Sequence, residues 1–400
     1  MISNEDLSGV IDSQKGAYLS QNPGVQRDGL NGVESFNSSG LFVLGVRGAG
    51  KSTYVRQLLS GRFPDPILLN MEDPRLSGFE SKDFSRLDSL LFGRANESLA
   101  FDEIQAVENW EAYIHLRQAE SRNIVVAASI ASIKHNGFSK GFHVRELFPF
   151  SYGEFLKVIH QDPSSETIEK YLKIGGFPEY VKSRSDEVLL RLFDDIIYRE
   201  IVVRQGIKHH DVFRQLAIHL IGNFSRYYSL NNLKNLFGIG SVRSVADYIA
   251  YLEDSYLIYS VPKYSESIKK QIANPRKIYC VDTGLARVTS VSLQQGNDQL
   301  LENMVYLHLR RGGSPIYYYS GLFECDFIVT NNNKPVSAIQ VCYDLNQNNL
   351  VKELKGIELA MKELNLDEGT IVTLDQEETF EIKNRQIRAI PAWKFLMEPI

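Results

Sequence analysis

A glycine-rich stretch near the start of the chain contains the residues with the clearest chemistry. An apolar run from Leu41 to Leu44 leads directly into Gly45-x-x-x-x-Gly50-Lys51-Ser52. In such a loop the glycines let backbone N–H groups surround an anion, the lysine reaches the β- and γ-phosphates, and the serine hydroxyl reaches Mg²⁺. The sequence therefore predicts a site for ATP and Mg²⁺, formed by Gly45, Val46, Arg47, Gly48, Ala49, Gly50, Lys51, Ser52 and Thr53.

Two carboxylates further along the chain could complete this chemistry. The apolar run Leu99 to Phe101 ends in Asp102 and Glu103. A carboxylate at the end of a buried strand can hold Mg²⁺ through water, and a second carboxylate beside it can orient and deprotonate the attacking water. We therefore predict that Asp102 and Ser52 hold the metal and that Glu103 is the general base, with Lys51 on the triphosphate.

A fourth catalytic candidate follows the next apolar run, which extends from Asn123 to Ala128 and ends at Ser129. In P-loop ATPases with an additional strand, this strand lies between the other two and its terminal polar residue senses the γ-phosphate. Ser129 is predicted to act in this way, although a serine here is equally compatible with a helix cap or a turn.

These residues can act together only if neighbouring strands of one sheet bring them to the same edge. Uninterrupted apolar runs at 41–44, 66–71, 98–102, 123–128 and 142–147 are typical of strands buried on both faces of a parallel sheet. Helices are expected near 52–59, 84–92 and 107–119. The first 38 residues are polar, with one helix expected at 11–20, and could cover the adenine of a nucleotide or be loosely ordered.

The middle of the chain has the pattern of a winged helix-turn-helix. Helices are predicted at 212–224, 229–237 and 241–254, followed by strands at 256–261 and 277–281. From Arg204 to Arg287 there are twelve Lys/Arg against six Asp/Glu, in a chain of net charge −5. This basic segment favours double-stranded DNA as a partner. The candidate DNA contacts are Ser241, Arg243, Ser244, Lys269, Lys270, Arg276 and Lys277.

The same helices could instead contact protein. Winged helices in ATPases often act as lids or protein interfaces, and the third predicted helix also carries the acidic residues Asp247, Glu253 and Asp254. The expected partners therefore include DNA, another protein and a second copy of this chain.

Several motifs, taken in order, resemble a known family. They are Gly45–Thr53, Leu69–Leu76, Phe101–Gln105, Glu146–Phe155, Gly175–Glu179, Tyr198–Ile201 and Val281–Gly284. Over nearly its whole length the chain resembles the prokaryotic AAA-type P-loop ATPases, AAA_14-like, that carry a C-terminal DUF4143 domain. The resemblance implies an α/β fold with an AAA+-like P-loop parallel sheet domain, then a helical and winged helix-turn-helix region, then an α/β domain similar to PD-(D/E)xK nucleases.

The chain departs from this family pattern at its arginines. Many relatives have Arg-Arg inside the phosphate loop and Gly-Arg before the fifth strand, whereas here the loop reads Arg47-Gly48 and the second place reads Ser139-Lys-Gly141. The arginine finger is therefore open among Arg47, Arg145, Arg199 and Arg204.

The nuclease-like resemblance places a second candidate site in the last hundred residues. Such nucleases use an acid from a helix, an Asp from the first strand of a hairpin, and Glu/Gln-x-Lys from the second strand. Glu302, Asp326 and Gln340 match these places, but Cys342 stands where the lysine belongs. Lys352 or Lys355 on the next helix could substitute, or could form its solvated face. Without the motif lysine, nuclease activity is not expected, and the domain would serve as a binding platform.

Composition and length bound the remaining expectations. No apolar run approaches the roughly 18 residues of a membrane span, and the first residues are acidic, so we expect a cytoplasmic protein without a membrane partner. Cys280, Cys325 and Cys342 have no metal-ligand spacing and are expected to be reduced structural thiols. The expected division is an N-terminal segment at 1–38, an ATPase domain at 39–160, a linker with winged helix at 161–287 and the DUF4143 domain at 288–400.

Three functions remain compatible with the sequence. The first is a Mg²⁺-dependent ATPase that couples hydrolysis to domain motion on DNA or a protein partner. The second is an ATP-regulated, Mg²⁺-dependent DNA nuclease, and the third is a nucleotide-dependent protein interaction switch that does not bind DNA. A phosphotransferase is disfavoured, since a carboxylate directly after Asp102 points to water as the nucleophile.

Overall fold

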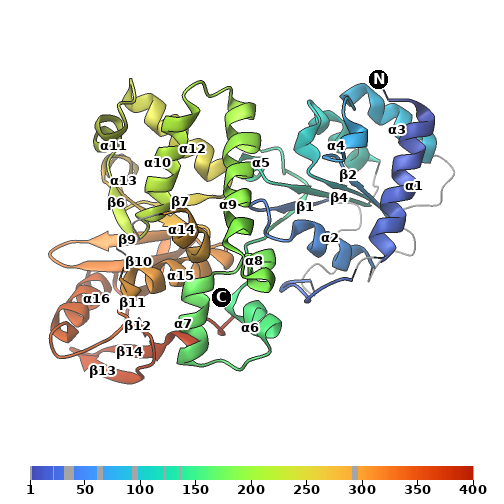
Figure 1. Ribbon diagram of the computed structural model, residues 1–400. Helices are drawn as coiled ribbons and strands as arrows, with labels where there is room; N and C mark the ends of the chain where they lie inside the picture. The colour runs from blue at the N-terminus through green and yellow to red at the C-terminus, as the bar shows by residue number, and fades with distance from the viewer. Residues whose placement is uncertain are drawn as a thin grey trace. The chain divides into compact units, whose positions relative to one another are not determined.

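The computed structural model describes residues 2–20, 22–30, 40–60, 66–91, 98–120, 123–135, 137–290 and 296–399. The chain divides into two compact units (Figure 1): residues 1–148 with 254–256, and residues 149–253 with 257–400. Among the helices of these described ranges, none combines the length and hydropathy needed to cross a bilayer.

The first unit is built on a five-stranded, wholly parallel sheet. Its strands are β1 (Leu41–Leu44), β2 (Ile67–Asn70), β3 (Ser98–Asp102), β4 (Asn123–Ala128) and β5 (His143–Glu146), in the order β2-β3-β4-β1-β5. β4 therefore lies between β1 and β3, which confirms the additional-strand arrangement predicted from the sequence. All four residues of β1 are buried, as its unbroken apolar run requires.

Helices and short 3₁₀ turns connect these strands. They are α1 (Asn4–Ser20), α2 (Lys51–Ser60), η1 (Pro74–Leu76), η2 (Ser81–Asp83), α3 (Phe84–Leu91), η3 (Ile104–Ala106), α4 (Trp110–Ala119) and α5 (Ser132–His135). α1 begins seven residues before the predicted helix at 11–20. Gln14 fixes α1 to the end of β2, because its side chain hydrogen-bonds the backbone of Asn70 and the carboxylate of Asp73.

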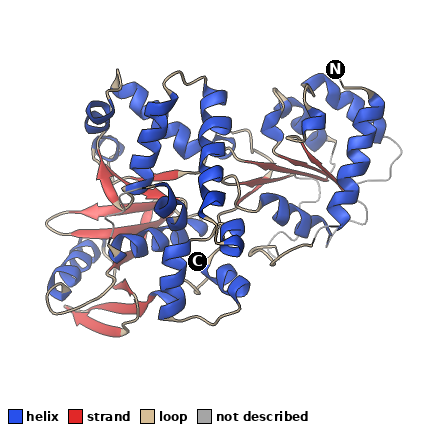
Figure 2. Cartoon of the chain, in the orientation of Figure 1, coloured by secondary structure: helices blue, strands red, loops and turns tan. Residues whose placement is uncertain are grey.

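The second unit begins with helices before its strands start (Figure 2). These are α6 (Tyr152–Ile159), α7 (Ser165–Ile174), α8 (Pro178–Ser183), α9 (Asp186–Asp194), a π-helical segment η4 (Asp195–Val203) and α10 (His210–Gly222). α6 starts with the capping box expected at its N-terminus: the Ser151 hydroxyl accepts from the Glu154 N–H, and the Glu154 carboxylate accepts from the Ser151 N–H.

Further helices and a small antiparallel sheet follow. Its elements are β6 (Arg226–Tyr228), α11 (Leu230–Phe237), α12 (Val242–Asp254), β7 (Ile258–Val261), α13 (Ile268–Ala273), β8 (Arg276–Cys280) and α14 (Thr283–Thr289). The sheet has the order β6-β8-β7, so β8 is its central strand. Neither β6 nor α13 was expected. β6 has three residues and exposes Arg226 and Tyr227, which leaves almost no hydrophobic pattern to read.

The C-terminal part is a mixed α/β domain. It comprises α15 (Asn297–Arg311), β9 (Ile316–Ser320), β10 (Glu324–Asn331), β11 (Lys334–Val341), α16 (Leu350–Leu364), β12 (Glu368–Thr373), β13 (Glu378–Ile382), β14 (Arg385–Pro391) and α17 (Ala392–Phe395). The six strands have the order β13-β14-β12-β11-β10-β9. β9, β10 and β11 form an antiparallel meander, and α16 crosses over to β12, which lies parallel to β11.

Candidate nucleotide site and a buried ionic cluster

The phosphate loop lies between the end of β1 and the start of α2. Gly48 and Gly50 have φ angles of +78° and +92°, which residues with a side chain rarely adopt. The loop is short and closed, since the Ala49 N–H donates to the Val46 carbonyl at 3.2 Å and the Tyr54 N–H to the Gly50 carbonyl at 2.9 Å. Glycine is therefore favoured at positions 48 and 50 because the loop needs a positive φ angle there.

Lys51 is at the centre of a polar group that joins three predicted site residues. Its side chain is 3% exposed, and its Nζ donates to Ser129 Oγ at 2.8 Å and to the Val46 carbonyl at 3.3 Å. The Glu103 Oε1 atom lies 3.4 Å from Lys51 Nζ, and Ser129 Oγ donates to Glu103 Oε2 at 3.3 Å. The ends of β3 and β4 thus bring the predicted base and the predicted sensor to the loop lysine.

Glu103 is held in a defined orientation. Its backbone is left-handed, with φ of 50°, and Gln105 Nε2 donates to its Oε2 at 2.5 Å. Burial acts to raise the pKa of Glu103, but the charge of Lys51 and the bond from Gln105 outweigh it and lower the pKa. Glu103 is therefore ionised at neutral pH and able to accept a proton.

Asp102 lies beside Ser52, and its carboxylate accepts a hydrogen bond from the Ser52 hydroxyl. The Asp102 side chain is 4% exposed, and its Oδ1 atom has no hydrogen-bond partner among the described residues. Burial, followed by the charge of Glu103, raises the pKa of Asp102. A buried carboxylate oxygen without a partner is costly in protein, and it fits a hard cation such as Mg²⁺ that the Ser52 hydroxyl would share.

A cavity of about 430 Å³ opens next to Ser52 and Asp102. Its other walls come from α1, α2, the end of β2 and the η1 turn, and include Gln14, Arg56 and Asn70. The predicted metal position is therefore accessible from this cavity.

Part of the N-terminal segment packs against the phosphate-loop helix. Gln57 Nε2 donates to the carbonyls of Pro23 and Val25, and Arg27 Nη1 donates to the Ala49 carbonyl at 2.5 Å. The Arg27 side chain is 3% exposed. Residues 22–30 thus brace the loop from outside, whereas residues 31–39 lie outside the described ranges, and an adenine-covering role for this segment stays a prediction.

The four candidate finger arginines have different surroundings. Arg47 forms a two-point ion pair with Glu72 at 2.6 and 2.8 Å, and Arg145 Nη2 donates to the Asp28 carbonyl at 3.5 Å. In the second unit, Arg199 pairs with Asp195 at 3.2 Å and is 70% exposed within the π-helical segment, and Arg204 is exposed. These contacts do not select one finger.

The predicted DNA contacts divide into exposed and buried residues. Ser241 and Arg243 are exposed at the start of α12, with Ser244 half-buried beside them, and Lys269 and Lys270 are exposed on α13. Arg276 is half-buried against Tyr228.

The prediction that Lys277 contacts DNA is wrong. Lys277 was expected at a basic surface, but it is only 3% exposed. It lies on the central strand β8, where its ammonium contacts carboxylates of the C-terminal domain. It is therefore unavailable to a DNA backbone.

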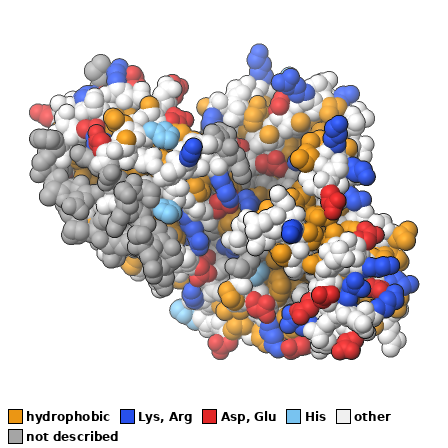
Figure 3. Space-filling model, turned by 180° about the vertical axis from the view of Figure 1, so that it is seen from behind, with side chains coloured by type: hydrophobic (Ala, Val, Ile, Leu, Met, Phe, Trp, Pro, Cys, Tyr) orange, Lys and Arg blue, Asp and Glu red, His pale blue; other side chains and the backbone are white. Residues whose placement is uncertain are grey.

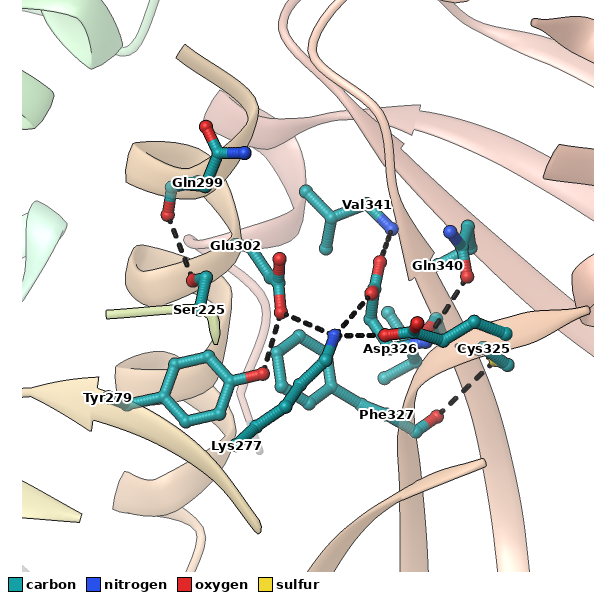
Figure 4. Close-up of polar contacts among 12 residues, drawn as sticks. Ser225, Lys277, Tyr279, Gln299, Glu302, Cys325, Asp326, Phe327, Gln340 and Val341 are labelled. Atoms are coloured by element: carbon teal, nitrogen blue, oxygen red, sulfur yellow. Dashed lines mark hydrogen bonds and ion pairs between the residues drawn. The ribbon is translucent and has the colours of Figure 1, made fainter. Parts of the chain in front are cut away.

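Three elements, α15, β10 and β11, bring together the nuclease-like residues Glu302, Asp326 and Gln340. The side chains of these residues are buried. Figure 4 shows Lys277 pointing between Glu302 and Asp326, with its Nζ 3.0 Å from an oxygen of each. Gln340 Oε1 accepts from the Asp326 N–H at 3.1 Å. The sequence-predicted set thus converges, but around a lysine from another element.

Neither lysine that was considered as a substitute occupies this place. Lys352 is 74% exposed and contacts Glu353, while Lys355 lies over the ring of Phe323. Cys342, at the motif position, is buried, and burial raises its pKa.

Sequence reasoning missed Lys277, Tyr279, Glu324 and Glu353 as members of this cluster. The alternation of side chains along a strand was an available signal: Lys277 and Tyr279 share one face of β8, and Glu324 and Asp326 share one face of β10. That β8 faces α15 and β10 was not readable, because no local pattern specifies which segments pack together.

Comparison with known proteins divides the chain into three family regions. Residues 37–156 match the AAA domain family AAA_14, residues 165–295 match the domain of unknown function DUF8612, and residues 297–395 match DUF4143. Among solved structures, a Walker-type ATPase of Pyrococcus abyssi aligns with 72% of this chain and 96% of that chain, at a TM-score of 0.40 and 14% identity.

Two proteins are similar over most of the length. An uncharacterized protein of Haemophilus influenzae is 27% identical over 332 residues, which cover 76% of this chain and 83% of that protein. An uncharacterized protein of Methanocaldococcus jannaschii is 30% identical over 389 residues, covering 88% of this chain and 87% of that protein. The chain therefore belongs to the same family as the Methanocaldococcus jannaschii protein, and it joins an AAA-type P-loop domain to the DUF8612 and DUF4143 domains.

Proposed function

We propose that this protein is an AAA+-like ATPase that binds ATP with Mg²⁺ and hydrolyses it. The observation that carries the proposal is the group formed by Lys51, Ser129 and Glu103, placed beside the orphaned oxygen of Asp102. Lys51, Ser129, Glu103 and Asp102 lie at one edge of the parallel sheet, where a loop lysine, a sensor, a base and a metal ligand would be needed. The AAA domain match at 37–156 supports nucleotide binding independently.

Each residue has a distinct part in this proposal. Lys51 exchanges its bonds to Ser129 and Glu103 for phosphate oxygens, which frees the Glu103 carboxylate to accept a proton from the attacking water. Gln105 keeps Glu103 oriented during this change. Ser52 and Asp102 would hold Mg²⁺, which neutralises phosphate charge when bound.

Hydrolysis would be coupled to movement of the following domains on DNA or a protein partner. We keep the division into 39–160, 161–287 and 288–400 as part of this proposal. The exposed Lys269 and Lys270 on α13 and Arg243 at the start of α12 support DNA as the partner. A nucleotide-dependent switch that contacts only protein remains the alternative if duplex DNA does not bind.

A pair of substitutions tests the ATPase proposal. Glu103→Gln keeps the size and the bond to Gln105 but removes the base, so ATP binding should persist while kcat falls roughly 10²- to 10⁴-fold. Lys51→Ala should abolish binding itself, since the loop loses its phosphate cation. Binding is measured by titration calorimetry and turnover by phosphate release. Turnover of the Glu103→Gln protein at the wild-type rate would refute the assignment of the base.

A further inference from the structure

The ionic cluster in the C-terminal part is built around one buried ammonium. Lys277 Nζ lies 3.0 Å from Glu302 Oε1, 3.0 Å from Asp326 Oδ1 and 2.5 Å from Glu324 Oε1. These oxygens come from α15 and β10, whereas the lysine comes from β8. Three carboxylates from two elements therefore share one cation supplied by a third.

Two of the three carboxyl groups, those of Glu302 and Asp326, also accept hydrogen bonds from other parts of the fold. The Tyr279 hydroxyl donates to Glu302 Oε1 at 2.7 Å, and the Val341 N–H donates to Asp326 Oδ2 at 2.9 Å. Gln340 accepts from the Asp326 N–H and donates to Glu353 Oε2 at 2.7 Å. The side chains of Glu302 and Asp326 are thus held in place by other groups of the fold and not by the lysine alone (Figure 4).

Charge and burial together define what this cage accepts. Burial opposes a charge on Lys277, but Asp326 and Glu302 outweigh it and hold the lysine pKa well above its ordinary value. Oxygen-only cages of this kind suit a hard divalent cation or an ammonium group. Among the described residues, no group of three His, Cys, Asp or Glu is arranged to hold a metal ion.

We propose that Lys277 is the built-in cation of this cage: its ammonium takes the place that a divalent ion would take. The C-terminal domain then binds no Mg²⁺ at this position and cleaves no phosphodiester there. The lysine instead fastens the central strand β8 to α15 and β10. This inference is independent of the proposed ATPase, since all of its residues belong to the second unit.

Removing the lysine side chain gives a direct test. Lys277→Ala leaves the carboxylates facing an empty space, so its melting temperature should fall by several degrees, on the order of 5 °C. Millimolar Mn²⁺ or ethylammonium should restore part of this loss in Lys277→Ala, by more than it raises the melting temperature of the wild type. Lys269→Ala, an exposed lysine on the neighbouring helix, is the matched control and should show neither loss nor rescue.

Two further measurements, on a double variant and on the wild type, decide whether the acids bind a divalent ion. Lys277→Ala with Asp326→Asn should lose the Mn²⁺ rescue, since a cage oxygen has lost its charge. If Lys277→Ala does not fold, Mn²⁺ counting by electron paramagnetic resonance on nucleotide-free protein decides: wild type and Asp326→Asn should bind equal numbers of ions. A wild-type ion that is lost in Asp326→Asn, or DNA cleavage that is lost in Asp326→Ala, would overturn the proposal.

Discussion

Two lysines of this protein are equally buried but differ in what surrounds them. Lys51 and Lys277 are each 3% exposed. Lys51 is held by a hydroxyl, a carbonyl and one carboxylate, and the neighbouring residues Ser52 and Asp102 line an open cavity. Lys277 is enclosed by three carboxylates. Partners that an anionic ligand can replace suit binding, whereas carboxyl groups packed around an ammonium suit a permanent polar cluster.

At the residue scale, His308 on α15 is predicted to make stability depend on pH. Burial, and then the charge of Arg311, lower the pKa of His308 to about 3 from its ordinary 6.5. Below pH 6.5 the unfolded chain binds a proton that the folded state refuses, so stability falls as the pH falls from 6.5 toward 3. Between pH 7 and 5 the loss should reach at most about 2 kcal/mol.

Urea unfolding at pH 7 and pH 5 measures this effect. His308→Gln should make the protein more stable at pH 5, relative to pH 7, than the wild type is, because the titrating ring is gone. His210→Gln removes an exposed histidine and should leave the difference as in the wild type. An unchanged pH dependence in His308→Gln would show that other groups cause it.

At the element scale, one buried aspartate joins two sequence motifs that are far apart. Asp282 caps α14 by accepting the Leu285 N–H at 2.8 Å, and its other oxygen accepts the Gly176 N–H at 2.6 Å. A side chain at Gly284 would lie 2.0 Å from the Ile174 carbonyl oxygen. Close packing of α14 on the end of α7 therefore explains the motifs Gly175-Gly176 and Asp282-Thr-Gly284. These motifs have a structural role.

This packing predicts that Gly284→Ala destabilises the second unit by about 1–3 kcal/mol, because the added methyl group meets a backbone atom that cannot move aside. Gly240→Ala provides the control, since a side chain there meets nothing within 4 Å. Thermal and urea unfolding of both variants should separate them clearly. Equal stability of the two variants would mean that the junction relaxes around the methyl group.

At the scale of the whole molecule, the distribution of charge bears on the expected DNA partner. On the face in Figure 3, basic, acidic and hydrophobic side chains are interspersed. The net charge of −5 also disfavours unselective attraction to nucleic acid. Any binding of DNA must therefore depend on a local basic surface. The exposed lysines of α13 are the candidate for such a surface.

Charge reversal tests this surface. Lys269→Glu with Lys270→Glu should weaken binding to duplex DNA about tenfold at low salt and make the dependence of log Kd on log salt shallower by about two. Fluorescence anisotropy on a labelled duplex measures both quantities. Lys352→Glu with Lys362→Glu changes the same charge on exposed positions of α16 and should have little effect. Equal losses in the two double variants would exclude α13 as the contact.

The sequence by itself determined the parallel sheet, the phosphate loop and the placement of Asp102 and Glu103 at a strand end. Apolar runs, glycine spacing and capping residues are local signals. The position of β4 between β1 and β3 was expected from P-loop ATPases with an additional strand and not from these signals. The resemblance to PD-(D/E)xK nucleases identified Glu302, Asp326 and Gln340 as one group. The sequence did not reveal β6, α13 or the cation of that group.

Only the tertiary structure decided which lysine faces those acids. Lys277 lies 49 positions from Asp326 and 25 from Glu302, and its own sequence surroundings are those of a basic surface strand. Its burial depends on β8 being the central strand of its sheet and packing against α15 and β10. A buried charge is stable only beside opposite charges, and contacts over such separations are fixed by packing, not by local propensity.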